Sequence, residues 1–400
     1  MSRSFTAIVC LLGVSFAGMS FTTETQRTQK EHREVENAAA LGHFFDALAQ
    51  TESKRRIEPV RIMHFGDSHV AADVLTREIR ERFQNEFGDG GAGFIVPRNP
   101  MTTRRRSVVS GATDGWRIDG IGGRSSPDAI YGPAGINLTT NGPGESAWLE
   151  ASASRFEVYF VREPGGGKIQ ISVDGVNVAD GTILLNSRVT RVDSVFVDLP
   201  DTRHRLEVKT LSPGRVRLLG IVSEHLSAGV AYDVFGINGA RASRILDWNQ
   251  AALAAAIKAR DPDLIILAYG TNEVADSDWT PDSYELLLKQ ILRQLHAAAP
   301  HASILLFAPP DRADLPLTGR LKSMVSAQRR AAFANNAAFW SAFDAMGGSG
   351  SMNNWLRRGL AQPDRVHLTG SGYAKLAEIF YEDLKRTRPN SVGRSSRHEQ

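Results

Sequence analysis

Strand-like and helix-like segments alternate in two stretches of this chain, and a strand-rich stretch separates them. In the first stretch, residues 44–107, the buried-strand pattern VRIMHF precedes apolar residues at helical spacing from Val74 to Phe87. In the second, residues 227–388, the strand-like runs DLIILAYG and SILLFAPP each precede a helical pattern. Strands that alternate with helices predict a parallel sheet with helices on both faces. The two stretches therefore predict one doubly wound α/β domain built from segments far apart in the chain.

The separating stretch, residues 108–226, predicts a different architecture. Its short runs, such as FEVYFVR, GKIQISV and HRLEVKTL, alternate polar and apolar residues and lack long helical periodicity. Turn signals separate these runs, and Asp174-Gly175 is a dipeptide typical of β-hairpins. We expect an inserted β-sandwich or jelly roll that interrupts the α/β domain.

The amino-terminal residues 1–20, MSRSFTAIVCLLGVSFAGMS, predict a secretory signal peptide, because one arginine precedes a short apolar run and small residues. An uncleaved membrane anchor is the alternative. Cys10 is the only cysteine, so a cleaved chain would have no disulfide and no cysteine-based metal site. No later run approaches membrane length. We expect residues 21–43 to be a linker, residues 389–400 to be a basic tail, and the protein to be periplasmic or extracellular.

Composition excludes some classes of protein. Hydrophobic residues make up 42% of the chain and charged residues 23%, which is typical of a soluble globular protein. The net charge of +3 is small for 400 residues, so we expect no nucleic-acid partner. The sequence gives no indication of oligomeric state.

Four polar loops follow predicted strands or precede the last helix, where a parallel sheet gathers its functional groups. They carry Ser68, Gly239, Asn272, and the pair Asp364 and His367. Taken singly, Ser68 fits a helix cap, Asn272 a turn residue, and the last two a surface pair. Taken together, they supply every group that acyl transfer from an ester needs.

The chemistry assigns a role to each group. A serine hydroxyl is a poor nucleophile without an adjacent base, and an imidazole can take its proton and return it to the leaving alcohol. Asp364 precedes His367 by one turn's spacing, so its carboxylate can orient that imidazole. The backbone N–H groups of Ser68 and Gly239 and the amide of Asn272 can stabilise the oxyanion. We expect no cofactor and no metal.

These blocks, GDSH, FGINGA, YGTNE and DRVH, resemble those of the SGNH (GDSL-like) hydrolase family, in the family's order. The resemblance implies a flavodoxin-like SGNH fold with Ser68 as nucleophile, His367 as base and Asp364 as its partner. It also implies that Gly239 and Asn272 donate to the oxyanion. The GDSH start and the β insertion look like the branch that contains bacterial peptidoglycan O-acetylesterases, whose inserted domain resembles a carbohydrate-binding jelly roll.

The sequence departs from the common family pattern at three points. His69 replaces the usual leucine, and Glu273 replaces a frequent aspartate. Gly236 lies three residues before Gly239, and we favour Gly239 as the donor. His64 and His69 lack a carboxylate at ligand spacing, so we interpret them as structural residues.

Three functions follow from this sequence. The first is an exported serine esterase that removes acetyl groups from an acylated carbohydrate. The second is an acyltransferase that uses the same triad with a sugar hydroxyl as acceptor. The third is a catalytically silent carbohydrate-binding protein, which the complete set of five groups argues against.

Overall fold

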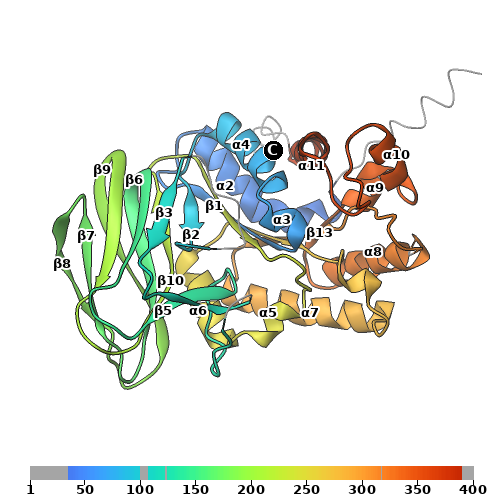
Figure 1. Ribbon diagram of the computed structural model, residues 1–400. Helices are drawn as coiled ribbons and strands as arrows, with labels where there is room; N and C mark the ends of the chain where they lie inside the picture. Colours follow the sequence, from blue (N-terminus) through green and yellow to red (C-terminus); the bar gives the residue numbers. More distant parts are fainter. Residues whose placement is uncertain (1–34, 100–106, 122–123, 317, 390–400) are drawn as a thin grey trace, which may run out of the picture. The chain divides into compact units, whose positions relative to one another are not determined.

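The computed structural model describes residues 35–99, 107–121, 124–316 and 318–389 (Figure 1). The expected signal peptide, most of the expected linker and nearly all of the basic tail lie outside these residues. Within the described ranges, no helix combines the length and apolar character needed to cross a membrane.

A five-stranded parallel sheet forms the centre of the α/β part, in the order β11-β1-β12-β13-β14. The strands are β1 Val60–Gly66, β11 Val230–Gly236, β12 Leu264–Ala268, β13 Ser303–Ala308 and β14 Ala338–Ser341. Numbered along the chain among themselves, they give the order 2-1-3-4-5 of flavodoxin-like folds. All their residues are buried, as expected of parallel strands covered on both faces.

Helices cover both faces of this sheet (Figure 1). One face packs against α2 Gly42–Glu52, α4 Leu75–Phe87, α9 Ala342–Met346, α10 Ser351–Arg357 and α11 Gly370–Thr387. The other face packs against α6 Gln250–Arg260, α7 Pro281–Ala298 and α8 Thr318–Phe333. Alternate residues of β1 supply the two cores, with Ile62 on the first face and Met63 and Phe65 on the second. The predicted doubly wound α/β fold is thus confirmed.

The strand-rich part forms a nine-stranded antiparallel sheet. Its strands are β2 Gly93–Ile95, β3 Val109–Ala112, β4 Arg117–Gly120, β5 Ile136–Thr140, β6 Ser146–Arg162, β7 Lys168–Val173, β8 Val176–Leu184, β9 Arg191–Thr210 and β10 Val216–Glu224. The long strands β6 and β9 pair along most of their length, with an irregularity between Ala153 and Arg155. On its other side, β6 pairs with β3 before this irregularity and with β10 after it. A strand that changes its pairing partner at a bulge or bend lets a β-sheet fold over into a sandwich-like arrangement.

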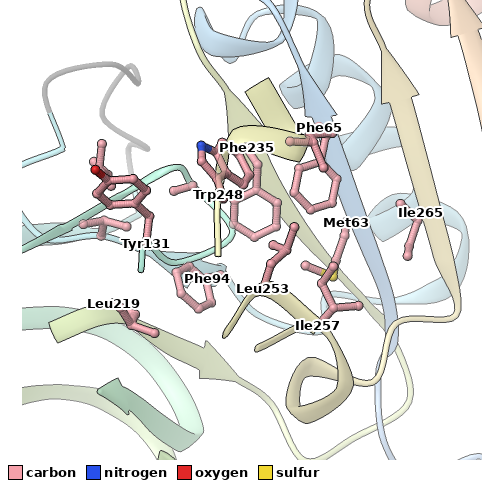
Figure 2. Close-up of a cluster of buried hydrophobic side chains, with 14 of the residues drawn as sticks. Met63, Phe65, Phe94, Tyr131, Leu219, Phe235, Trp248, Leu253, Ile257 and Ile265 are labelled. Carbon is pink, nitrogen blue, oxygen red and sulfur yellow. The ribbon is translucent and has the colours of Figure 1, made fainter. Parts of the chain in front are cut away.

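The antiparallel sheet and the α/β part share one hydrophobic core (Figure 2). Met63 and Phe65 of β1 lie beside Phe235 of β11, and Phe94 of β2 and Leu219 of β10 belong to the same cluster. The first strand of the antiparallel sheet, β2, lies before residue 108. The assignment of residues 108–226 to a separate inserted domain stays a prediction.

Candidate active site

The predicted site residues meet at the carboxyl edge of the parallel sheet. Ser68 lies just beyond β1, Gly239 beyond β11 and Asn272 beyond β12. Strand order changes direction around β1, and open α/β sheets bind ligands outside the strand ends at such a point. Asp364 and His367 come from the loop before α11, which brings them to the same edge.

A continuous hydrogen-bonded chain joins three of these side chains. The Oγ atom of Ser68 lies 2.9 Å from Nε2 of His367. The opposite ring nitrogen, Nδ1, lies 2.7 Å from Oδ2 of Asp364. This is the geometry in which an imidazole can accept the serine proton while a carboxylate stabilises the resulting imidazolium. About a third of the His367 side chain is exposed (34%), so a substrate can reach it.

The loop that carries Asp364 and His367 is closed by its own backbone. An isolated bridge joins Ala361 to Leu368, and the Gln362 N–H donates to the carbonyl of His367 (2.8 Å). The residues lie in this loop and not in a helical turn, yet their side chains still face each other. Oδ1 of Asp364 accepts the N–H groups of residues 366 and 367, both at 3.0 Å.

These contacts keep Asp364 ionised. Its partial burial acts to raise the pKa of the carboxyl, but the two backbone donors and the His367 side chain outweigh it, so the pKa of Asp364 is lowered. The carboxylate is therefore charged at any pH at which a neutral imidazole could act as a base.

The turn after β1 places Ser68 at the start of the short helix α3, Ser68–Ala71. Asp67 caps this helix, because its Oδ1 accepts the N–H of His69 at 3.0 Å. Ser68 therefore does not cap the helix, and its hydroxyl group faces His367 instead. Asp73, with φ of 48°, separates α3 from α4 and pairs with Arg80 at 3.0 Å.

The structure distinguishes the two glycines of the second block. A Cβ added to Gly236 would lie 2.1 Å from the backbone nitrogen of Ala71, so this glycine is packed tightly against α3. Gly239 is exposed at a φ of 71°, and an added Cβ would have no described atom within 4 Å. The space beside the Cα of Gly239 is therefore open to a ligand, whereas that of Gly236 is filled by α3, which favours Gly239 as the candidate donor.

The Asn272 side chain lies beside the same loop. Its Nδ2 donates to the carbonyl of Ala240 at 2.9 Å, which uses one of the two amide hydrogens. The second hydrogen can serve an oxyanion. Arg312, in the loop after β13, donates to the carbonyl of Thr271 and so buttresses the backbone next to Asn272.

Two buried carboxyl groups lie beneath this edge, and sequence reasoning gave neither a role. Burial raises the pKa of Glu273 to about 7, and the nearby charge of Asp67 adds to the effect. Burial likewise raises the pKa of Asp67 to about 6, although the His69 N–H and the Thr271 donors oppose it. In the sequence, only their positions point to the site, because Asp67 directly precedes Ser68 and Glu273 directly follows Asn272.

His69 is a buried neighbour of His367. Their ring centroids are 5.2 Å apart, and Nδ1 of His69 lies 2.8 Å from the Tyr373 hydroxyl. Burial lowers the pKa of His69 to about 3, so this imidazole is neutral beside that of His367. His64 lies deeper, 2.7 Å from the Tyr232 hydroxyl, and burial lowers its pKa to about 3 as well.

Comparisons with known proteins agree with this geometry. Residues 210–375 match the GDSL-like lipase/acylhydrolase family, a range that contains Gly239, Asn272, Asp364 and His367. Ser68 precedes it, because the strand-rich part separates the first block from the others. No curated protein matches the sequence.

Solved structures give a second comparison. A peptidoglycan O-acetylesterase is 29% identical, with a TM-score of 0.73 over 87% of this chain and 96% of that one. Two matches are far weaker and carry no weight here. A lipase/acylhydrolase from Enterococcus faecalis is 18% identical over 40% of this chain and 77% of that one (TM-score 0.32). A family two carbohydrate esterase from Cellvibrio japonicus is 15% identical over 70% and 97% (TM-score 0.30).

The family match and the similarity along most of the chain favour an enzyme over a silent binding protein. The chain is an ester-hydrolysing enzyme, and its residues 210–375 are similar to the GDSL-like lipase/acylhydrolase family.

Proposed function

We propose that this enzyme is exported and removes O-acetyl groups from the sugars of a cell-envelope polysaccharide, through an acyl-enzyme on Ser68. The observation that carries the chemistry is the chain of two hydrogen bonds, 2.9 Å from Ser68 to His367 and 2.7 Å from His367 to Asp364. The similarity to a peptidoglycan O-acetylesterase supports the choice of an acetylated sugar as substrate. The apolar run at the amino terminus supports export.

Acylation begins when Oγ of Ser68 attacks the acetyl carbonyl carbon and Nε2 of His367 takes the hydroxyl proton. The carbonyl oxygen becomes an oxyanion, which the N–H groups of Ser68 and Gly239 and the Asn272 amide stabilise. The bond to the sugar oxygen then breaks, and His367 gives its proton to that oxygen. The deacetylated sugar leaves, and the acetyl group stays on Ser68.

Deacylation repeats these steps with water as the nucleophile. His367 takes a proton from water as the water oxygen bonds to the acetyl carbon. The second oxyanion collapses, the ester bond to Ser68 breaks, and His367 returns the proton to Oγ. The product leaves as acetic acid, which gives its remaining proton to water and becomes acetate, and the resting enzyme is restored. Asp364 stays ionised throughout and stabilises the imidazolium in both halves.

The experiment measures acetate release from O-acetylated peptidoglycan and hydrolysis of p-nitrophenyl acetate by wild type, Ser68→Ala and Ser53→Ala. Ser53 follows α2 and is exposed, so its variant is the matched control. We expect wild type and the control to release acetate, and Ser68→Ala to lose at least ~10⁴-fold in kcat. Activity on p-nitrophenyl acetate without acetate release from the polymer would contradict the proposed substrate. A Ser68 that a fluorophosphonate labels, with acetyl transferred to an added glycan and none to water, would contradict hydrolysis in favour of transfer.

A further inference from the structure

The two loops that supply the oxyanion hole come from strands that do not touch. Gly239 follows β11 and Asn272 follows β12, and β1 lies between these strands in the sheet. Strands two positions apart are separated by about 9–10 Å. The backbone hydrogen bonds of β1 with β11 and with β12 set the spacing of these strands. They do not set the distance between the loops that follow β11 and β12. Contacts between the loops must do so.

One buried carboxylate joins both loops. Oε1 of Glu273 accepts the N–H of Ala242 at 2.7 Å, and Oε2 accepts the N–H of Gly270 at 3.1 Å. Ala242 lies just after Gly239 in the first loop, and Gly270 lies just before Asn272 in the second. Only 4% of Glu273 is exposed, so water cannot replace these bonds without opening the fold.

Two further contacts tie the same loops together. The Asn272 amide donates to Ala240 at 2.9 Å, and Arg241 forms an ion pair with Asp276. The Arg241 side chain is 43% exposed, so this ion pair contributes little. The buried contacts of Glu273 are the strong ones, because a lost hydrogen bond to a buried carboxyl group cannot be replaced by water. Once this carboxyl group ionises, the two bonds also become charge-assisted.

We propose that Glu273 is a positioning residue that holds the loops of Gly239 and Asn272 at the separation that the oxyanion requires. This inference rests on the proposed acyl-enzyme chemistry, in which the oxyanion hole acts twice in each turnover. The length of the side chain matters to this role. A side chain one methylene shorter, on the same backbone, reaches less far toward the N–H of Ala242.

The test compares Glu273→Gln and Glu273→Ala with wild type and with Glu163→Gln. The amide of glutamine keeps one acceptor but turns an NH₂ donor toward the second N–H, and alanine keeps no acceptor. Glu163 is a matched control, because it is fully buried in the antiparallel sheet and paired with Arg217 at 2.6 Å. The control measures what the loss of any buried glutamate charge does to the enzyme.

Two readouts decide the proposal. With p-nitrophenyl acetate, we expect kcat of Glu273→Gln to fall by about 10–100-fold, and that of Glu273→Ala by more, with KM within about threefold of wild type. Per folded molecule, the kcat of Glu163→Gln stays within about twofold. In hydrogen–deuterium exchange, peptides containing Ala242 and Gly270 should exchange faster in both Glu273 variants than in Glu163→Gln.

The outcomes separate the two proposals. Faster exchange with unchanged kcat would overturn the positioning role, and unchanged exchange would overturn the contact itself. If wild type does not hydrolyse esters and Ser68 is not labelled by a fluorophosphonate, the proposed function fails. The exchange measurement then still reports whether Glu273 joins the loops.

Discussion

Ser68 and His367 lie 299 residues apart in the chain, yet Oγ of the first is 2.9 Å from Nε2 of the second. The parallel sheet produces this contact, since β1 delivers Ser68 to its carboxyl edge and α11 packs against α4 on the same face. The loop with Asp364 and His367 precedes α11 and is anchored by the Ala313 N–H, which donates to the Arg365 carbonyl at 2.9 Å. The contact between Ser68 and His367 therefore depends on the packing of β1, α4, α11 and the loop before α11.

Asp364→Asn should leave the fold intact and remove most of the activity. The amide can still face Nδ1 of His367, but it cannot balance the imidazolium charge, and its NH₂ group favours the wrong tautomer. We expect kcat to fall by about 10²–10⁴-fold. The control is Asp46→Asn, on the exposed side of α2. A kcat for Asp364→Asn within tenfold of this control would show that His367 does not need the carboxylate.

The two glycines of the second block should respond differently to alanine. Gly236→Ala forces a Cβ to within 2.1 Å of the Ala71 backbone, so we expect unfolding free energy to fall by about 3 kcal/mol or more. Gly239→Ala meets open space and costs only the left-handed backbone, about 1–2 kcal/mol. Urea denaturation of both variants measures this difference. Equal losses would mean that Gly236 is not packed as the structure has it.

Much of this site is readable from the sequence, for a physical reason. Buried parallel strands leave continuous apolar runs, and the polar residues just beyond them must lie at the sheet edge, so Ser68, Gly239 and Asn272 could be placed in advance. The contact between Asp364 and His367 was also expected, although a loop and not a helical turn provides it.

Other features could not be predicted, because they depend on how distant segments pack. The sequence shows that residue 273 is a glutamate, but it does not show whether the carboxyl group faces solvent or two backbone N–H groups. The pairing of His69 with Tyr373 joins residues 304 positions apart. The two sheets share one hydrophobic core (Figure 2). The sequence pattern indicates the individual strands, but it does not indicate which strands of the two sheets pack against each other.

Arg260→Met should destabilise the protein strongly. Arg260 is almost fully buried on α6, and its guanidinium contacts Asp233 of β11 at 2.7 Å and Glu224 of β10 at 2.6 Å. Methionine fills much of the volume but leaves two buried carboxylates with one cation fewer. We expect a loss of about 3–5 kcal/mol in unfolding free energy.

The matched control for this loss is Lys258→Met, on the exposed side of the same helix. Its unfolding free energy should change by no more than about 0.5 kcal/mol. Comparable effects of the two variants in urea denaturation would show that the charge network between β10, β11 and α6 does not stabilise the fold.

The buried carboxyl groups of Glu273 and Asp67 should make stability fall as pH rises. Burial raises the pKa of Glu273 to about 7 and that of Asp67 to about 6, whereas both titrate near pH 4 in the unfolded chain. Between about pH 4.5 and 7 the folded protein holds protons that the unfolded chain has released, so a rise in pH favours unfolding. Above pH 7 the cost of ionising Glu273 is complete, roughly 3 kcal/mol for a shift of this size.

Glu273→Gln removes this titration and isolates the effect. The variant loses hydrogen bonds at every pH, which lowers its unfolding free energy by a constant amount. Because the amide does not ionise, the variant should gain on wild type by about 1–3 kcal/mol between pH 5 and pH 8. Urea denaturation of both proteins at the two pH values measures this gain. A constant difference between them would mean that Glu273 does not titrate in this interval, and that its two N–H donors offset the cost of burial.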